Sequence, residues 1–192
     1  MGKEKSEIKA VVWDIGGVLL EDPKVGDFWK EIEGSKQLRK EFGSNKLSIE
    51  KFVLRGAKLL GMTEKNFLSS YKKAYFSIKP IKDSLKIYEN MKTNRYILCD
   101  TNSLHMDFIK ETFPKIFEIS KRNYFSPELK MRKDSREIFE YVSKNLDFSP
   151  NQILFIDNKK EIVDLARDVG FRVIHYIDSI KLKKDLAKLG VK

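Results

Sequence analysis

The sequence predicts an α/β protein: a doubly wound, Rossmann-type parallel sheet with an inserted helical cap domain. Buried strands are indicated by short apolar runs at residues 9–13, 95–100, 152–157 and 171–177. Amphipathic helical patterns separate the later runs, and strands that alternate with helices form a parallel sheet. Residues 21–87 break this rhythm with helical patterns alone, which indicates an insertion after the first strand.

The first strand ends in an unusual way. Residues 11–13 are β-branched or aromatic and are typical of a buried parallel strand. Asp14 follows directly, and Gly16 and Gly17 come shortly after it. Glycine lets backbone N–H groups and an incoming substrate approach closely, so a carboxylate beside glycines can act as a nucleophile. The alternative is that Asp14 caps a helix or forms a salt bridge.

The insertion contains recognisable helix starts. Ser48 and Thr63 each precede a segment with helical apolar spacing and are predicted N-caps. We expect residues 21–87 to form a helical cap that covers the site and excludes water. Residues 1–20 and 88–192 are then the α/β core.

The remaining elements alternate as a doubly wound sheet requires. Amphipathic patterns predict helices at residues 103–113, 134–146, 160–170 and 179–192, and the pattern at residues 82–92 leads from the insertion back to the sheet. Gly170 stands where a helix C-cap is expected, so the chain turns there into the last strand. The C-terminal pattern is basic but has leucines at helical spacing, and we expect it to pack on the core with its lysines outside.

The composition excludes several classes of protein. The chain has 192 residues, a net charge of +10 and one cysteine, Cys99, so it has no internal disulfide framework. Its lysines are interleaved with acidic residues, which indicates a solvated surface and argues against a nucleic-acid partner. No apolar run approaches the roughly 20 residues that span a bilayer, and residues 1–10 lack the apolar core of a signal peptide. We therefore expect a cytoplasmic protein without membrane contact; the sequence indicates no oligomeric state.

Carboxylates follow three of the predicted strands. Asp14, Asp100 and Asp157 each stand at the carboxyl end of a run. Ligands of such sheets bind outside the carboxyl ends of the strands, so these side chains are expected to meet in one crevice.

The first and third of these carboxylates, together with a lysine, suggest how the charges are balanced. Two close carboxylates repel each other unless a cation sits between them, and oxygen ligands such as Asp14, Asp157 and the neighbouring Asn158 suit Mg²⁺. Lys133, which precedes a predicted helix, could neutralise Asp14 and a bound phosphoryl group. Taken alone, each could instead be a solvated surface residue.

The segments 11–20, 97–102, 126–142 and 153–174 resemble, in this order, motifs I to IV of the haloacid dehalogenase-like (HAD) hydrolase superfamily. The helical insertion falls where that family carries its cap. The resemblance is greatest to the phosphatase branch that includes glucose-1-phosphate phosphatases and the N-terminal phosphatase domains of epoxide hydrolases.

The resemblance implies a Mg²⁺-dependent phosphatase that acts on a small phosphorylated metabolite through an aspartyl-phosphate intermediate. It makes Asp14 the nucleophile and Lys133 the motif III lysine. It implies a metal site formed by Asp14, the carbonyl of Gly16, Asp157 and Asn158. The expected substrate-binding residues are Gly17, Cys99, Asp100 and Thr101.

Two departures from the family pattern concern the chemistry. Most phosphatases of the family have an aspartate at the position of Gly16, which protonates the leaving group and then activates water; the loss of such a group costs about 10²–10⁴ in rate. Motif II normally offers a hydroxyl where this sequence has Cys99, and a thiol is a weak donor. His105 and Asp100 are the candidates to replace the missing acid.

The departures leave an alternative open: a degenerate HAD-like protein that binds phosphate or a partner with little or no turnover. A haloacid dehalogenase proper is less favoured, because that reaction needs no metal and Asp157 resembles a metal ligand.

Overall fold

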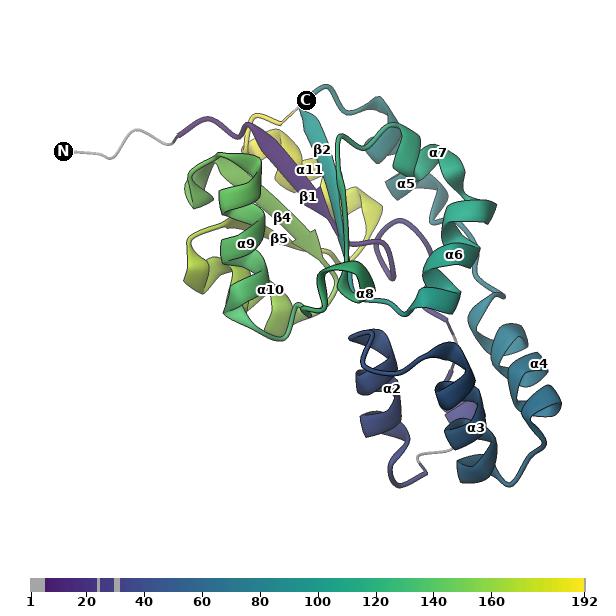
Figure 1. Ribbon diagram of the computed structural model, residues 1–192. Coiled ribbons are helices and arrows are strands. Elements are labelled where there is room, and N and C mark those ends of the chain that lie inside the picture. The colour runs from purple at the N-terminus through teal and green to yellow at the C-terminus, as the bar shows by residue number, and fades with distance from the viewer. Residues whose placement is uncertain (1–5, 24, 30–31, 192) are drawn as a thin grey trace.

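The computed structural model describes residues 6–23, 25–29 and 32–191 (Figure 1). Its centre is a five-stranded, all-parallel sheet in the order β3-β2-β1-β4-β5. The strands are β1 (Ala10–Trp13), β2 (Asn94–Cys99), β3 (Asn123–Phe125), β4 (Ile153–Asp157) and β5 (Arg172–His175). The predicted doubly wound α/β fold is confirmed, and four of its strands coincide with the predicted runs.

The edge strand β3 is absent from the prediction made above. It spans Asn123–Phe125 and pairs only with β2. A strand of this length shows too little apolar alternation to stand out in a sequence. It forms by pairing with β2, where Ile97 aligns with Asn123 and Cys99 aligns with Phe125.

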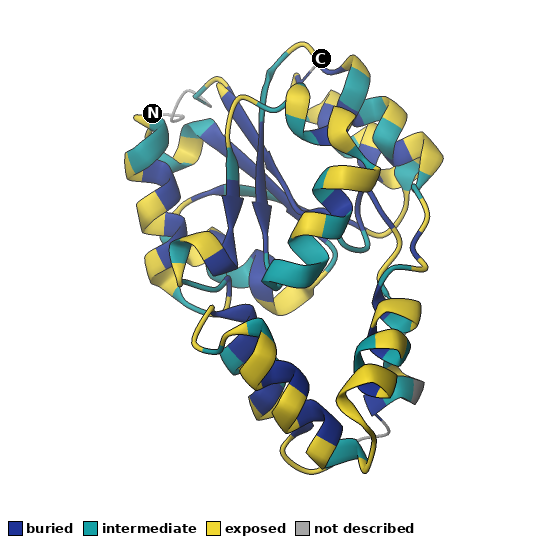
Figure 2. Ribbon diagram, turned by 45° about the vertical axis from the view of Figure 1, so that its right-hand side comes forward, coloured by how far each residue is buried: buried dark blue, intermediate teal, exposed yellow. Residues whose placement is uncertain are grey.

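Helices cover both faces of the sheet, as the alternation along β1 requires. Val11 and Trp13 face one cluster, which is covered by α5 (Lys82–Asn90), α6 (Ser103–Thr112), α7 (Pro114–Glu118) and α11 (Ser179–Lys188). Ala10 and Val12 face the other, covered by α9 (Arg136–Leu146) and α10 (Lys160–Val169). The strands lie buried between these layers (Figure 2).

The insertion is helical. It consists of α1 (Gly26–Trp29), α2 (Ser35–Gly43), α3 (Ile49–Leu60) and α4 (Glu64–Tyr75). The side chains of Ser48 and Thr63 accept backbone hydrogen bonds at the starts of α3 and α4, which confirms the two predicted N-caps. An aromatic cluster that includes Trp29 and Phe52 forms a separate core. The division of the chain at residues 20/21 and 87/88 stays a prediction.

The insertion lies beyond the carboxyl ends of the strands, whose arrows point toward it (Figure 2). The two segments that connect it to the sheet pair with each other: Glu21 N–H donates to Lys79 O (2.8 Å) and Ile81 N–H donates to Leu19 O (2.9 Å). This pairing holds the cap helices over the edge of the sheet formed by the carboxyl ends of the strands, where the predicted site residues lie.

Within the described residues, no helix is both long enough and apolar enough to cross a bilayer.

The packing of α3 on α4 yields a prediction. A Cβ at Gly56 would lie 2.2 Å from Cζ of the fully buried Phe67 ring. Alanine is the better helix former by about 1 kcal/mol, and overpacking costs about 1–3 kcal/mol. Because a separation of 2.2 Å puts this cost in the upper part of its range, Gly56→Ala is expected to lower the free energy of unfolding by about 1–2 kcal/mol in urea titrations. Leu54→Ala, on the exposed side of the same helix, is the control and should change it by less than about 0.5 kcal/mol. Equal stability of Gly56→Ala and wild type would show that the ring is free to move.

Candidate active site

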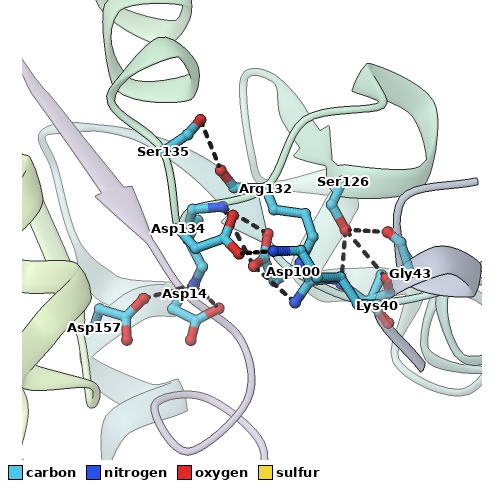
Figure 3. Close-up of polar contacts among 11 residues, drawn as sticks. Asp14, Lys40, Gly43, Asp100, Ser126, Arg132, Asp134, Ser135 and Asp157 are labelled. Carbon is cyan, nitrogen blue, oxygen red and sulfur yellow. Dashed lines mark hydrogen bonds and ion pairs between the residues drawn. The ribbon is translucent and has the colours of Figure 1, made fainter. Parts of the chain in front are cut away.

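Two carboxylates and one ammonium group meet at the carboxyl end of the sheet. Asp14 continues the pairing of β1 with β4 by one residue, its N–H donating to Ile156 O (2.9 Å), and Asp157 is the last residue of β4. Lys133 Nζ lies 2.8 Å from Asp14 Oδ1 and 2.6 Å from Asp157 Oδ2. Asp14 and Asp157 lie side by side in Figure 3, and all three residues are at most 4% exposed.

The segment that carries Lys133 is held by Asp100. The Lys133 N–H donates to both oxygens of the Asp100 carboxylate (3.1 and 3.3 Å), and Arg132 Nη2 lies 3.2 Å from Oδ2 (Figure 3). The charge of Asp100 is therefore compensated from within the chain. These contacts explain how a carboxylate can directly follow Cys99 without being an unpaired charge in the crevice.

Burial dominates the electrostatics of this triad. It raises the pKa of Asp14 to about 7, with Lys133 opposing the shift and Asp157 adding to it. Burial alone would lower the pKa of Lys133, but the Asp14 and Asp157 carboxylates outweigh it and raise that pKa above its usual range. The ammonium group therefore stays charged.

The surroundings of Asp157 and Asn158 fit a hard cation. Asp157 Oδ1 accepts a hydrogen bond from Lys159 N–H (2.8 Å), while Asn158 Oδ1 is buried and has no hydrogen-bond partner among the described residues. Among all residues that the structure describes, no three or more His, Cys, Asp or Glu side chains lie close enough together to hold a metal ion by themselves. Mg²⁺ does not require such a group, because it binds through one or two carboxylates and keeps several waters.

The two glycines of the first motif have different structural roles. Gly17 has a φ of 69°, which favours glycine, and a Cβ there would lie 2.0 Å from Asn158 Nδ2. Its N–H donates to Leu20 O (2.7 Å), so this group closes the loop. Gly16 does not lie in the left-handed region, and what a Cβ there would meet is the side chain of Asp22, with Oδ1 at 2.7 Å.

The loop after β2 is tied to the cap by a residue that the sequence analysis did not single out. Ser126, fully buried, accepts from Thr101 N–H (3.0 Å), and its hydroxyl lies 3.0 Å from Gly43 O at the end of α2 (Figure 3). Ser126 begins α8 (Ser126–Leu129) and is followed by proline, a helix start with no sequence sign of a long-range partner. Cys99 is buried beside the triad, and burial raises the pKa of its thiol well above the usual range.

A cavity of about 250 Å³ opens beside the triad, between core and cap. Larger grooves lie along α9 and between α5 and α11, away from the carboxylates, so size alone does not mark the site. The cavity is lined by parts of every predicted motif and by residues of the cap, including Gly16, Asp22, Arg39, Gly43, Tyr75, Cys99, Asp100, Thr101, His105, Arg132 and Lys159.

Comparison with known proteins identifies the fold. No protein-family model matches the chain. In structure the chain resembles the HAD family enzyme BT-2542 from Bacteroides thetaiotaomicron in complex with magnesium and inorganic phosphate, with a TM-score of 0.75, 19% identity and coverage of 89% of this chain and 95% of that one. The chain has the HAD fold.

Two further HAD-fold structures are similar. One is a predicted HAD-like family hydrolase from Porphyromonas gingivalis, with a TM-score of 0.72, 18% identity and coverage of 95% and 99%. The other is the L-2-haloacid dehalogenase from Xanthobacter autotrophicus with chloropropionic acid covalently bound, with a TM-score of 0.62, 18% identity and coverage of 94% and 83%. The fold that the resemblance of the four motifs implied is thus confirmed.

One curated relative is matched over part of its length. The sesquiterpene phosphatase astK of Aspergillus oryzae is 37% identical over 59 residues, which is 31% of this chain and 30% of that protein. The match spans less than a third of either protein.

Within this HAD fold, His105 lies at the cap side of the site. Its ring stacks on those of Phe76 and Phe108, and its Nδ1 is 3.2 Å from the Thr101 hydroxyl. Burial lowers the pKa of His105 to about 4, so the imidazole is neutral near pH 7 and holds no proton for a leaving group.

The lowered pKa of His105 predicts an acid sensitivity. Between pH 6.5 and about 4 the unfolded chain binds a proton that the folded protein excludes, so stability falls as the pH falls, by about 2–3 kcal/mol at pH 4.5. Urea titrations at pH 7 and pH 4.5 should therefore show a smaller loss of stability for His105→Gln than for the wild type, by that amount. Equal losses would mean that the histidine becomes protonated in the folded protein.

Proposed function

We propose that the protein is a Mg²⁺-dependent phosphatase that hydrolyses a small phosphorylated metabolite through an aspartyl-phosphate on Asp14. The observation that carries the proposal is the buried Lys133 ammonium between Asp14 and Asp157. Phosphoryl transfer is catalysed mainly by positioning and by charge compensation, and this arrangement supplies both.

The nucleophile in this proposal is the Asp14 carboxylate. Lys133 contacts one of its oxygens, which favours the ionised form despite burial, and compensates for the charge of an approaching phosphoryl group. In this proposal the cap limits the access of bulk water to the transferring group. A cavity of about 250 Å³ suits a small substrate.

The metal in this proposal would be held by Asp14, the carbonyl of Gly16, Asp157 and Asn158. The buried Asn158 Oδ1, which lacks a partner in the described residues, supports its part in the set. Bound Mg²⁺ would supply further compensation for phosphoryl charge. The presence of magnesium and inorganic phosphate in the BT-2542 complex supports the proposal by analogy of fold.

The substrate contacts follow from what each candidate side chain already binds. Thr101 and Cys99 line the cavity and remain proposed substrate residues, as does Gly17, whose lack of a side chain leaves room for Asn158. We assign Asp100 a positioning role, because its carboxylate binds Lys133 N–H and Arg132. A location in the cytoplasm, predicted from the sequence, completes the proposal.

A second candidate is an HAD-fold protein that binds phosphate or a partner without turnover. It is favoured by Gly16, which carries no acid, and by the protonated Cys99 thiol, which is a weak donor.

Hydrolysis of an aryl phosphate separates the two candidates. With Mg²⁺, the wild type is expected to release product, and Asp14→Asn is expected to reduce the rate to that of the uncatalysed reaction, because an amide does not form the phosphoenzyme. Asp83→Asn, an exposed change on α5, is the matched control and should keep wild-type activity. Turnover by Asp14→Asn would exclude it as nucleophile, and a wild type that binds Mg²⁺ and phosphate without turnover would favour the second candidate.

Metal binding is expected to depend on Asp157. A ligand that binds only the folded state adds about 2.7 kcal/mol of stability at 100 times its Kd, so Mg²⁺ should raise the thermal midpoint of the wild type. The same titration should leave Asp157→Asn nearly unshifted, because the site loses one of its two carboxylates. Asp83→Asn should respond like the wild type. An equal shift for Asp157→Asn and wild type would exclude a metal site built on Asp157.

A further inference from the structure

Phosphatase chemistry at Asp14 needs two proton transfers. The leaving oxygen must gain a proton when the phosphoryl group moves to Asp14, and water must lose one when the phosphoenzyme is hydrolysed. Gly16 carries no group for either step. The inference below rests on the proposed function and concerns which residue takes its place.

The two candidates named from the sequence are already engaged. Both Asp100 oxygens accept a hydrogen bond from the Lys133 N–H, and Oδ2 also contacts Arg132. His105 Nδ1 faces the Thr101 hydroxyl, and its ring is enclosed by aromatic side chains.

A third carboxylate occupies the space that the glycines leave open. A Cβ on Gly16 would lie 2.7 Å from Asp22 Oδ1, and a Cβ on Gly17 would lie 2.8 Å from Asp22 Oδ2. The Asp22 carboxylate therefore stands over both glycines, where a side chain at residue 16 would begin. It lines the same cavity as Cys99 and Thr101.

The backbone and one hydrogen bond bring Asp22 to this place. Gly17 N–H donates to Leu20 O, which turns the chain back on itself, and Leu20 pairs with Pro80 at the junction with the cap. Asn158 Nδ2 then donates to Asp22 Oδ2 (3.1 Å), although the two residues are 136 positions apart in sequence. This contact leaves Oδ1 directed at Gly16.

We propose that Asp22 is the catalytic acid and base of this site, supplied from the cap junction in place of a side chain at residue 16. In the first step an Asp14 oxygen bonds to phosphorus, the bond to the leaving oxygen breaks, and that oxygen takes the proton of the Asp22 carboxyl group. In the second step water attacks phosphorus and gives a proton to the Asp22 carboxylate. The bond to Asp14 breaks, inorganic phosphate leaves, and both aspartates return to their starting states.

The first test is Asp22→Asn, which keeps an oxygen that can accept from Asn158. With an alkyl phosphate, steady turnover is expected to fall about 10²–10⁴-fold, because both steps lose their proton transfer. With an aryl phosphate, whose leaving group needs little protonation, the first step survives. A product burst should then be followed by slow turnover, with the mass of one phosphoryl group on the intact protein.

The second test moves the carboxylate to residue 16. Gly16 lies outside the left-handed region, so an aspartate fits its backbone once the Asp22 side chain is shortened. The double variant Gly16→Asp/Asp22→Ala should recover at least about tenfold of the alkyl phosphatase rate that Asp22→Ala loses. Asp83→Asn, the exposed change on α5 that lies away from this cavity, is the control and should keep wild-type rates. Thermal midpoints confirm that each variant is folded.

The outcomes separate this inference from the proposed function. If the wild type turns over and Asp22→Asn matches it with both substrates, Asp22 is not the acid and base while the phosphatase proposal stands. If Asp22→Asn abolishes the Mg²⁺-dependent rise in thermal midpoint, Asp22 is a metal ligand and the inference is wrong. If the wild type forms neither product nor phosphoenzyme with Mg²⁺, both are wrong.

Discussion

One buried ammonium group holds the site together. Lys133 Nζ contacts carboxylates that follow two neighbouring strands, and without it Asp14 and Asp157 would repel each other in a water-poor environment. Removing one partner from such a buried cluster costs about 3–5 kcal/mol, because the remaining charges stay unpaired. In the proposed reaction the same charge would also compensate for the charge of an approaching phosphoryl group. The stability of the site and the proposed chemistry therefore depend on one side chain.

The cap contributes to the site through a few polar contacts near its ends. Ser126 links the loop after β2 to the end of α2, and the paired segments around Leu20 and Pro80 bring Asp22 over the first motif. The aromatic cluster inside the cap contains no strand residue, and it meets the core at α6, where Leu104 packs against it and His105 contacts Tyr75.

The sequence by itself determined the architecture and the pair of acids at its centre. Apolar runs and amphipathic periods of ordinary length define four strands and most helices, because their patterns are local. Parallel strands end at one edge of a sheet, so carboxylates that follow separate strands, such as Asp14 and Asp157, must approach each other whatever lies between them. The strand Asn123–Phe125 escaped prediction because three residues show no period.

Only the tertiary structure decided what each remaining polar group does. Asp100, expected from the sequence to bind substrate, lines the cavity and also binds Arg132 and the Lys133 backbone. Ser126 begins the third motif segment, but no pattern in the sequence indicated its contact with Thr101. Asp22 meets Asn158 across 136 positions of sequence. Such contacts depend on the direction of single side chains and on how the cap closes on the core, and neither leaves a periodic trace along the chain. The charged residues of the site can therefore be predicted from the sequence, whereas the partner of each charged group is decided only by the folded structure.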